Sequence, residues 1–86
     1  MRHAGPATLD KLEPLLARLR AIGGLKEKSR GVFYRRAKAF LHFHEDPAGL
    51  FADIRTADGT DFERLQVDGG DAQEALARMA EARARR

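Results

Sequence analysis

The sequence predicts a small α+β domain in which helices at both ends of the chain pack on one face of a four-stranded antiparallel sheet, in the order α-β-β-β-β-α. Three observations predict this class. Apolar residues recur at helical spacing near each end, apolar and polar residues alternate between residues 32 and 67, and turn signals separate the alternating runs. Because 86 residues are fewer than the roughly 100 to 150 of a typical domain, residues 1–86 are predicted to form one domain, with frayed ends at 1–7 and 84–86.

The first helix is predicted from apolar residues spaced three or four apart, namely Leu9, Leu12, Leu15, Leu16, Leu19 and Ile22. Asp10 and Glu13 have capping-box spacing, and proline is tolerated only near a helix start, so the regular helix is expected to begin between Asp10 and Pro14. Gly23 and Gly24 are expected to end it. Residues 25–30 show no period and are predicted to be a connection.

Four strands are predicted at residues 32–35, 39–44, 50–55 and 62–67, with turns at 35–38, 46–49 and 57–60. Alternation in the second strand puts Leu41 and Phe43 on one face and Phe40, His42 and His44 on the other. In the third strand Phe51, Asp53 and Arg55 share a face. Phe62 and Leu65 are out of phase, which indicates either a bulge near Glu63 or Arg64 or different bounds for this strand.

The last helix is predicted over residues 72–83, after the break at Gly69 and Gly70. Asp71 and Glu74 repeat the capping-box spacing, and alanines with Leu76 form a small-residue face. Such a face can pack closely on a sheet, which completes the predicted two-layer architecture.

Composition excludes several classes of protein. With no cysteine, the chain has no disulfide, thiolate metal site or cysteine nucleophile. No apolar run approaches the roughly 18 residues of a membrane span, and the start has no secretory apolar region, so a cytoplasmic protein without a membrane partner is predicted. Ser29 is the only serine and no glycine-rich phosphate loop is present, so we expect a non-enzymatic protein without a cofactor.

Charge is distributed unevenly along the chain. Residues 1–43 hold ten Lys/Arg and three Asp/Glu, whereas residues 44–86 hold six and ten. A basic segment with aromatic residues is typical of polyanion binding, and its candidate residues are Lys26, Lys28, Arg30, Tyr34, Arg35, Arg36 and Lys38. The partner would be nucleic acid or an acidic protein. In the alternative interpretation, the acidic half lies beside the basic half in the folded domain and neutralises it.

The stretch FYRRAKAFLHFHEDPAGLFADIR, within residues 31–67, resembles small bacterial proteins of no assigned function, and the order of elements is similar to that of frataxin-like and double-wing folds. Some double-wing proteins are thought to bind DNA. No functional residue of such a family matches a position here, and the order of elements alone implies no activity.

Two further hypotheses concern the sheet face that the helices leave open. His42 and His44 lie about 6 to 7 Å apart along one strand face, which suits two ligands of one metal, with Glu45, Asp46 or Asp53 as a carboxylate ligand. The alternative is a structural histidine pair that donates to a neighbouring acid. The candidate face as a whole would serve a homodimer or a protein partner, and it comprises Phe40, His42, His44, Phe51, Asp53 and Arg55.

Overall fold

The chain folds into one antiparallel sheet covered on one side by helices, and the structure, a computed structural model, describes residues 1–85. In chain order the elements are β1 (Arg2–His3), α1 (Pro6–Lys11), α2 (Glu13–Arg20), β2 (Lys26–Ser29), β3 (Val32–Arg35), β4 (Lys38–Asp46), β5 (Gly49–Arg55), β6 (Phe62–Gln66) and α3 (Gly70–Ala84). The predicted α+β class, with an antiparallel sheet and helices at both ends, is confirmed.

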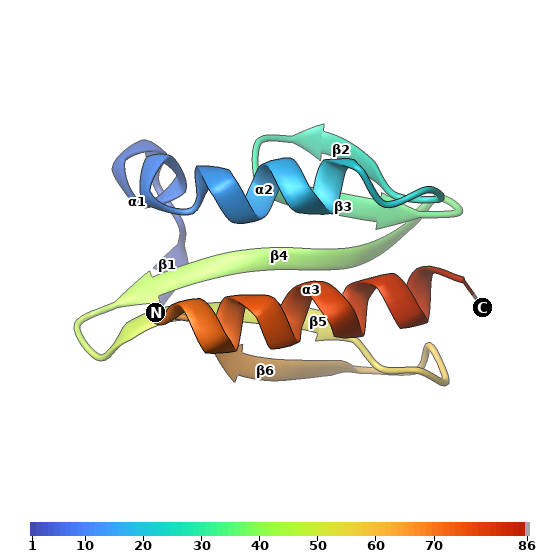
Figure 1. Cartoon of the computed structure of the whole chain (residues 1–86). Coiled ribbons are helices and arrows are strands. Elements are labelled where there is room, and N and C mark those ends of the chain that lie inside the picture. Colours follow the sequence, from blue (N-terminus) through green and yellow to red (C-terminus); the bar gives the residue numbers. More distant parts are fainter. Residues whose placement is uncertain (86) are drawn as a thin grey trace.

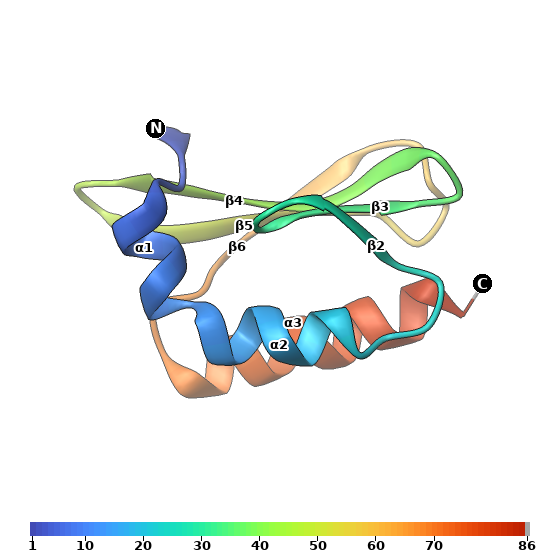
Figure 2. The same cartoon turned by 90° about the horizontal axis from the view of Figure 1, so that it is seen from above.

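Strands β2 to β6 follow one another across the sheet as a meander, and β1 pairs antiparallel with the end of β4 (Figure 1). Helices α2 and α3 lie side by side on one face of the sheet, whereas α1 descends from the sheet layer to α2 (Figure 2). Within residues 1–85, the opposite face carries no helix. Side chains on that face are therefore available to form a site.

The prediction of four strands is wrong, because the sheet has five strands in its meander and β1 as a sixth. β2 was expected to be part of a connection. Its sequence, Lys-Glu-Lys-Ser, has no apolar alternation, and backbone pairing with β3 across the tight turn at Arg30 and Gly31 makes it a strand. Residues 1–7 are expected from the sequence to fray, but in the structure they include β1 and the start of α1. At the other end α3 includes Ala84, while Arg86 lies outside the described residues.

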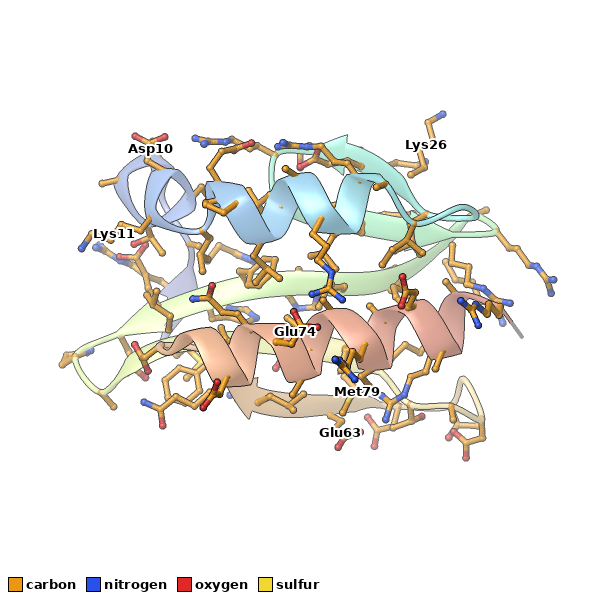
Figure 3. All side chains as sticks on the ribbon, in the orientation of Figure 1. Asp10, Lys11, Lys26, Glu63, Glu74 and Met79 are labelled. Carbon is orange, nitrogen blue, oxygen red and sulfur yellow. The ribbon has the colours of Figure 1, made fainter. Side chains whose placement is uncertain are left out.

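The helix ends differ from the predicted capping boxes. Leu12 separates α1 from α2, and Pro6 and Pro14 each stand in a first helical turn, where a missing N–H costs little. Gly69 is the N-cap of α3, and the caps of α2 and α3 make no side-chain hydrogen bond. Glu74 instead pairs with Arg18 and Arg78, which places it between α2 and α3 (Figure 3).

The core lies between the sheet and the two long helices. It includes Leu12, Leu16 and Leu19 from the N-terminal helices, Phe33, Leu41, Phe43 and Ile54 from the sheet, and Leu76 and Ala80 from α3. Phe40 joins this core and is only 3% exposed, so the expectation that it lies on the open face is wrong. The reason is a register shift between β3 and β4, where Phe33 faces Leu41 and Tyr34 faces Ala39, so that Phe40 has no partner and departs from the alternation.

The predicted bulge near Glu63 or Arg64 does not form, since β5 and β6 pair in regular register from Phe51 opposite Gln66 to Arg55 opposite Phe62. Phe62 therefore lies with Arg64 on the face opposite Leu65. None of the helices among residues 1–85 has the length and apolar composition needed to cross a membrane.

Candidate functional sites

The structure divides the basic segment into three groups. Lys26 and Lys28 stand on edge strand β2, with Lys26 opposite Tyr34 and the Lys28 Nζ 4.8 Å from the centre of the Tyr34 ring. The Lys26 side chain points away from the sheet edge (Figure 3). Arg30, at the β2–β3 turn, donates to Asp10 at 2.7 Å and to Glu13 at 2.8 Å, so its charge is balanced by the N-terminal helices. Both of these acids belong to residues 1–43, so the neutralisation of Arg30 does not come from the acidic half of the chain.

The third group, Arg35, Arg36 and Lys38, lines a pocket of about 250 Å³. Its lining residues come from the β3–β4 turn, the β5–β6 loop and the C-terminal end of α3, and Arg55 and Arg83 also line it. Phe40, although almost fully buried, also lines it. We refer to these residues as the basic pocket.

Three arginines of the basic pocket are held by backbone carbonyl groups. Arg55 Nε donates to Ala39 O at 2.6 Å and its Nη1 to Gly59 O at 2.9 Å. Arg83 Nη1 donates to Arg55 O at 3.0 Å, and Arg35 Nε donates to Ala84 O at 3.1 Å. These bonds order the guanidinium groups and leave further N–H donors on each of them, because a guanidinium carries five.

The β3–β4 turn that carries Arg36 has an unusual backbone. Arg36 and Ala37 both have positive φ, 52° and 68°, in a two-residue hairpin loop between paired Arg35 and Lys38. Loops of this kind favour asparagine and glycine, since other residues are strained in the left-handed region. The sequence keeps an arginine here at the cost of strain, and that arginine faces the pocket.

The charges of the basic pocket are unbalanced. Among residues 1–85, Asp58 is the one carboxylate that lines it, against five cationic side chains. Thr56 and Thr60 donate hydrogen bonds to Asp58 and lower the pKa of its carboxyl group, so it belongs to the polar loop Thr56–Thr60. Of the five cations only Arg83 forms an ion pair with a carboxylate of the described residues, that of Glu63.

A second candidate site lies on the open face. The register puts His42 opposite Asp53, and Asp53 opposite Arg64 on the next strand. His44 Nε2 lies 3.1 Å and His42 Nε2 3.5 Å from Asp53 Oδ2. The contact of His44 is close, but its direction is wrong for a hydrogen bond, and Nε2 of His44 is buried without a hydrogen-bond partner among the described residues. We refer to His42, His44 and Asp53 as the histidine cluster.

Burial and charge set the protonation of this cluster. Asp53 is 8% exposed, and two hydrogen bonds from Arg64 lower the pKa of its carboxyl group against the opposing effect of burial. At His42 burial has the opposite effect and lowers the pKa of the imidazole. The nearby His44 lowers this pKa further, whereas Asp53 raises it. Neutral imidazole is therefore favoured at His42 beside an ionised carboxylate.

Three neighbours of the histidine cluster were not predicted from the sequence. His3 stacks on His44 with ring centres 4.9 Å apart, and Phe62 packs edge-on against His42 at 5.4 Å. These residues, with Arg64, reach the cluster through strand pairing that the sequence does not reveal. Of the predicted carboxylates, Asp53 joins the histidines, whereas Glu45 accepts from Arg2 and from the Gly5 N–H. Asp46 caps its own turn by accepting from the Ala48 N–H.

The remaining open-face candidates are dispersed. Phe51 is half-buried opposite His44. Arg55 belongs to the basic pocket, and its guanidinium lies 4.6 Å from the centre of the Phe62 ring. Because the Phe62 ring also packs against His42, the predicted face holds two neighbouring groups, Arg55 in the basic pocket and the histidines with Asp53.

The chain matches no protein-family model, and no curated protein or solved structure matches it.

Proposed function

We propose that this protein is a non-enzymatic binding module whose basic pocket binds the phosphate backbone of nucleic acid. The observation that carries the proposal is the convergence of five cationic side chains on one pocket with a single carboxylate among the described residues. Phosphate groups are the natural ligands of such a set, because arginine donates two parallel N–H groups to phosphate oxygens.

Ordering of the pocket supports this function. The backbone bonds to Arg35, Arg55 and Arg83 restrict their side chains before a ligand arrives, which reduces the entropy lost on binding. Backbone strain at Arg36 points the same way, since strain tends to be retained where a residue serves a function.

We infer a polymeric anion rather than a small one, because further basic residues stand on the hairpin whose second strand leads to the pocket. Lys26, Lys28 and Tyr34 lie on the same β2–β3 hairpin and are free of carboxylate partners within residues 1–85. They would contact phosphates next to the one in the pocket, while Tyr34 adds a ring for stacking. Contacts of this kind are independent of base sequence.

The test is binding of a short fluorescent DNA duplex, measured by anisotropy at several salt concentrations. Arg36→Ala should weaken binding several-fold and reduce the steepness of the salt dependence by about 0.9 in log–log slope, the contribution of one phosphate contact. Arg30→Ala is the matched control, because it removes the same charge from a residue that Asp10 and Glu13 already neutralise.

We expect Arg30→Ala to bind as the parent protein does. Equal loss of affinity in the two variants would show that only net charge matters, and absence of binding at low salt would refute the proposed function.

A further inference from the structure

The histidine cluster has the dimensions of a metal site. Its three ligand atoms all lie within 4.8 Å of one another. With metal–ligand bonds of about 2.1 Å, neighbouring ligand atoms of a tetrahedral site lie about 3.4 Å apart. The two distances from Asp53 Oδ2 to the imidazole nitrogens, 3.1 Å and 3.5 Å, fall on either side of that value. A small rotation of the imidazole rings would bring the nitrogens together around one ion.

We propose that His42, His44 and Asp53 bind a divalent transition-metal ion such as Zn²⁺, with His3 as the fourth ligand. This site is separate from the basic pocket and does not depend on nucleic-acid binding.

The buried nitrogen of His44 supports the proposal. Burying a polar atom without a partner is costly, so native proteins seldom leave one in this state. Nε2 of His44 lies 3.1 Å from the Asp53 Oδ2 oxygen without forming a hydrogen bond to it. A metal ion between the two atoms would satisfy both of them.

The short strand β1 supplies the next nitrogen ligand. His3 pairs with His44 in the register of β1 and β4, and its ring centre lies 4.9 Å from that of His44 and 5.9 Å from that of His42. The His3 side chain is exposed, so its ring is free to turn toward the cluster. β1 therefore places a third imidazole beside the first two.

Arg64 positions the carboxylate. It donates from Nε to Oδ1 and from Nη2 to Oδ2 of Asp53, at 2.7 Å and 2.8 Å, which fixes the plane of the carboxylate with Oδ2 facing the imidazoles. Hydrogen-bond partners of metal ligands orient those ligands in this way.

The competing interpretation is that Asp53 serves only to pair with Arg64, and that the histidines only pack around this pair.

The ligand set predicts selectivity. Imidazole nitrogens suit Zn²⁺, Ni²⁺ and Cu²⁺, whereas Mg²⁺ and Ca²⁺ prefer sites made of oxygen. We expect Zn²⁺ and Co²⁺ to bind and Mg²⁺ to give no response.

The experiment is calorimetric titration of the full chain, without a histidine tag, with Zn²⁺, and titration with Co²⁺ followed by its visible absorption. His42→Ala and Asp53→Asn should each weaken binding by at least tenfold, and His3→Ala should weaken it by less. Asp71→Asn is the matched control, because Asp71 is an exposed carboxylate at the start of α3, the helix that covers the other face of the sheet (Figure 2), and it should bind as the parent does. Circular dichroism in the presence of a chelator shows which variants keep the fold.

Because Asp53→Asn removes the buried partner of Arg64 and can prevent folding, His42→Ala is the deciding variant. A parent protein that does not bind Zn²⁺ would overturn the proposal. Zn²⁺ binding that survives in His42→Ala at full strength would place the ion elsewhere and overturn it as well.

Discussion

Arg64 forms a bidentate ion pair with Asp53 on the neighbouring strand, donating from Nε to Oδ1 at 2.7 Å and from Nη2 to Oδ2 at 2.8 Å. The carboxylate is buried, whereas the arginine side chain is 50% exposed. The pair is therefore asymmetric, because the arginine can be hydrated without its partner and the carboxylate cannot. Removal of the arginine should cost more than removal of an arginine from an exposed pair.

Arg64→Ala should lower the free energy of unfolding by about 1 to 3 kcal/mol, since it leaves a buried carboxylate short of its charged donor. Arg78→Ala is the control. It breaks an exposed pair with Glu74 on one helix and should cost about 0.5 kcal/mol or less. Urea unfolding measures both values, and equal costs would show that burial of Asp53 contributes nothing.

Gly31→Ala should destabilise the fold by about 1 to 2 kcal/mol from backbone strain, because Gly31 has φ of 81°. A Cβ there would also come within 2.7 Å of a Leu9 side-chain carbon, which must move aside. Gly23→Ala is the matched control, since a Cβ at Gly23 meets nothing within 4 Å and its φ is not positive. Thermal unfolding should separate the two variants clearly, and similar melting temperatures would contradict this account.

Ala37→Gly should stabilise the β3–β4 hairpin by about 0.5 to 1 kcal/mol, because glycine relieves the left-handed strain and loses some of that gain through its more flexible unfolded state. Ala37 has φ of 68°. Nucleic-acid binding should be retained, since Arg36 stays in place. A stabilised variant that had lost DNA binding would show that the strain itself, and not the arginine, serves the function.

The pKa of Glu13 is lowered to about 2, chiefly because Arg20 and then Arg30 donate hydrogen bonds to its carboxylate. The unfolded chain takes up this proton near its ordinary value of 4.5, so the unfolded state binds more protons between pH 4.5 and about 2. The stabilisation from Glu13 should therefore be complete above pH 4.5 and be lost as pH falls through that window.

Carboxyl chemical shifts followed by NMR give the pKa of Glu13 directly. Glu13→Gln should flatten the fall of stability over the same window, and added salt should reduce the difference because the pair is exposed. A pKa near 4.5 for Glu13 would refute its ion pairs with Arg20 and Arg30.

The sequence predicted the parts of the fold that show hydrophobic periodicity. The apolar spacing from Leu9 to Ile22 and the alternation in β4 and β5 each correspond to a buried face. β2 could not be predicted in this way, because Lys-Glu-Lys-Ser has no apolar face and its pairing comes from a neighbouring strand. Phe40 was misplaced because a register shift depends on two strands and leaves no mark in one of them.

The two sites were predictable to different degrees. The pairing of His42 and His44 follows from their spacing within one strand. Asp53 shares their face through the register of the β4–β5 hairpin. His3 and Arg64 come from strands at other places in the chain, so only the assembled register brings them in. In the basic pocket, Arg35, Arg36 and Lys38 were predicted from the charge of their segment. Arg55 and Arg83 were not, because only the folded chain brings the end of β5 and the end of α3 to that segment.

The outer strands of the sheet, β2 and β6, present charged residues where a neighbouring chain would add its own strand. Lys26 and Lys28 are exposed on β2, which is also irregular between Glu27 and Ser29, and Glu63 and Arg64 are exposed on β6. Lysines and bulges at a sheet edge hinder the stacking of strands from different molecules into fibrils. Substituting valine or isoleucine at Lys26 and Lys28 would thus remove a barrier to aggregation without touching the core.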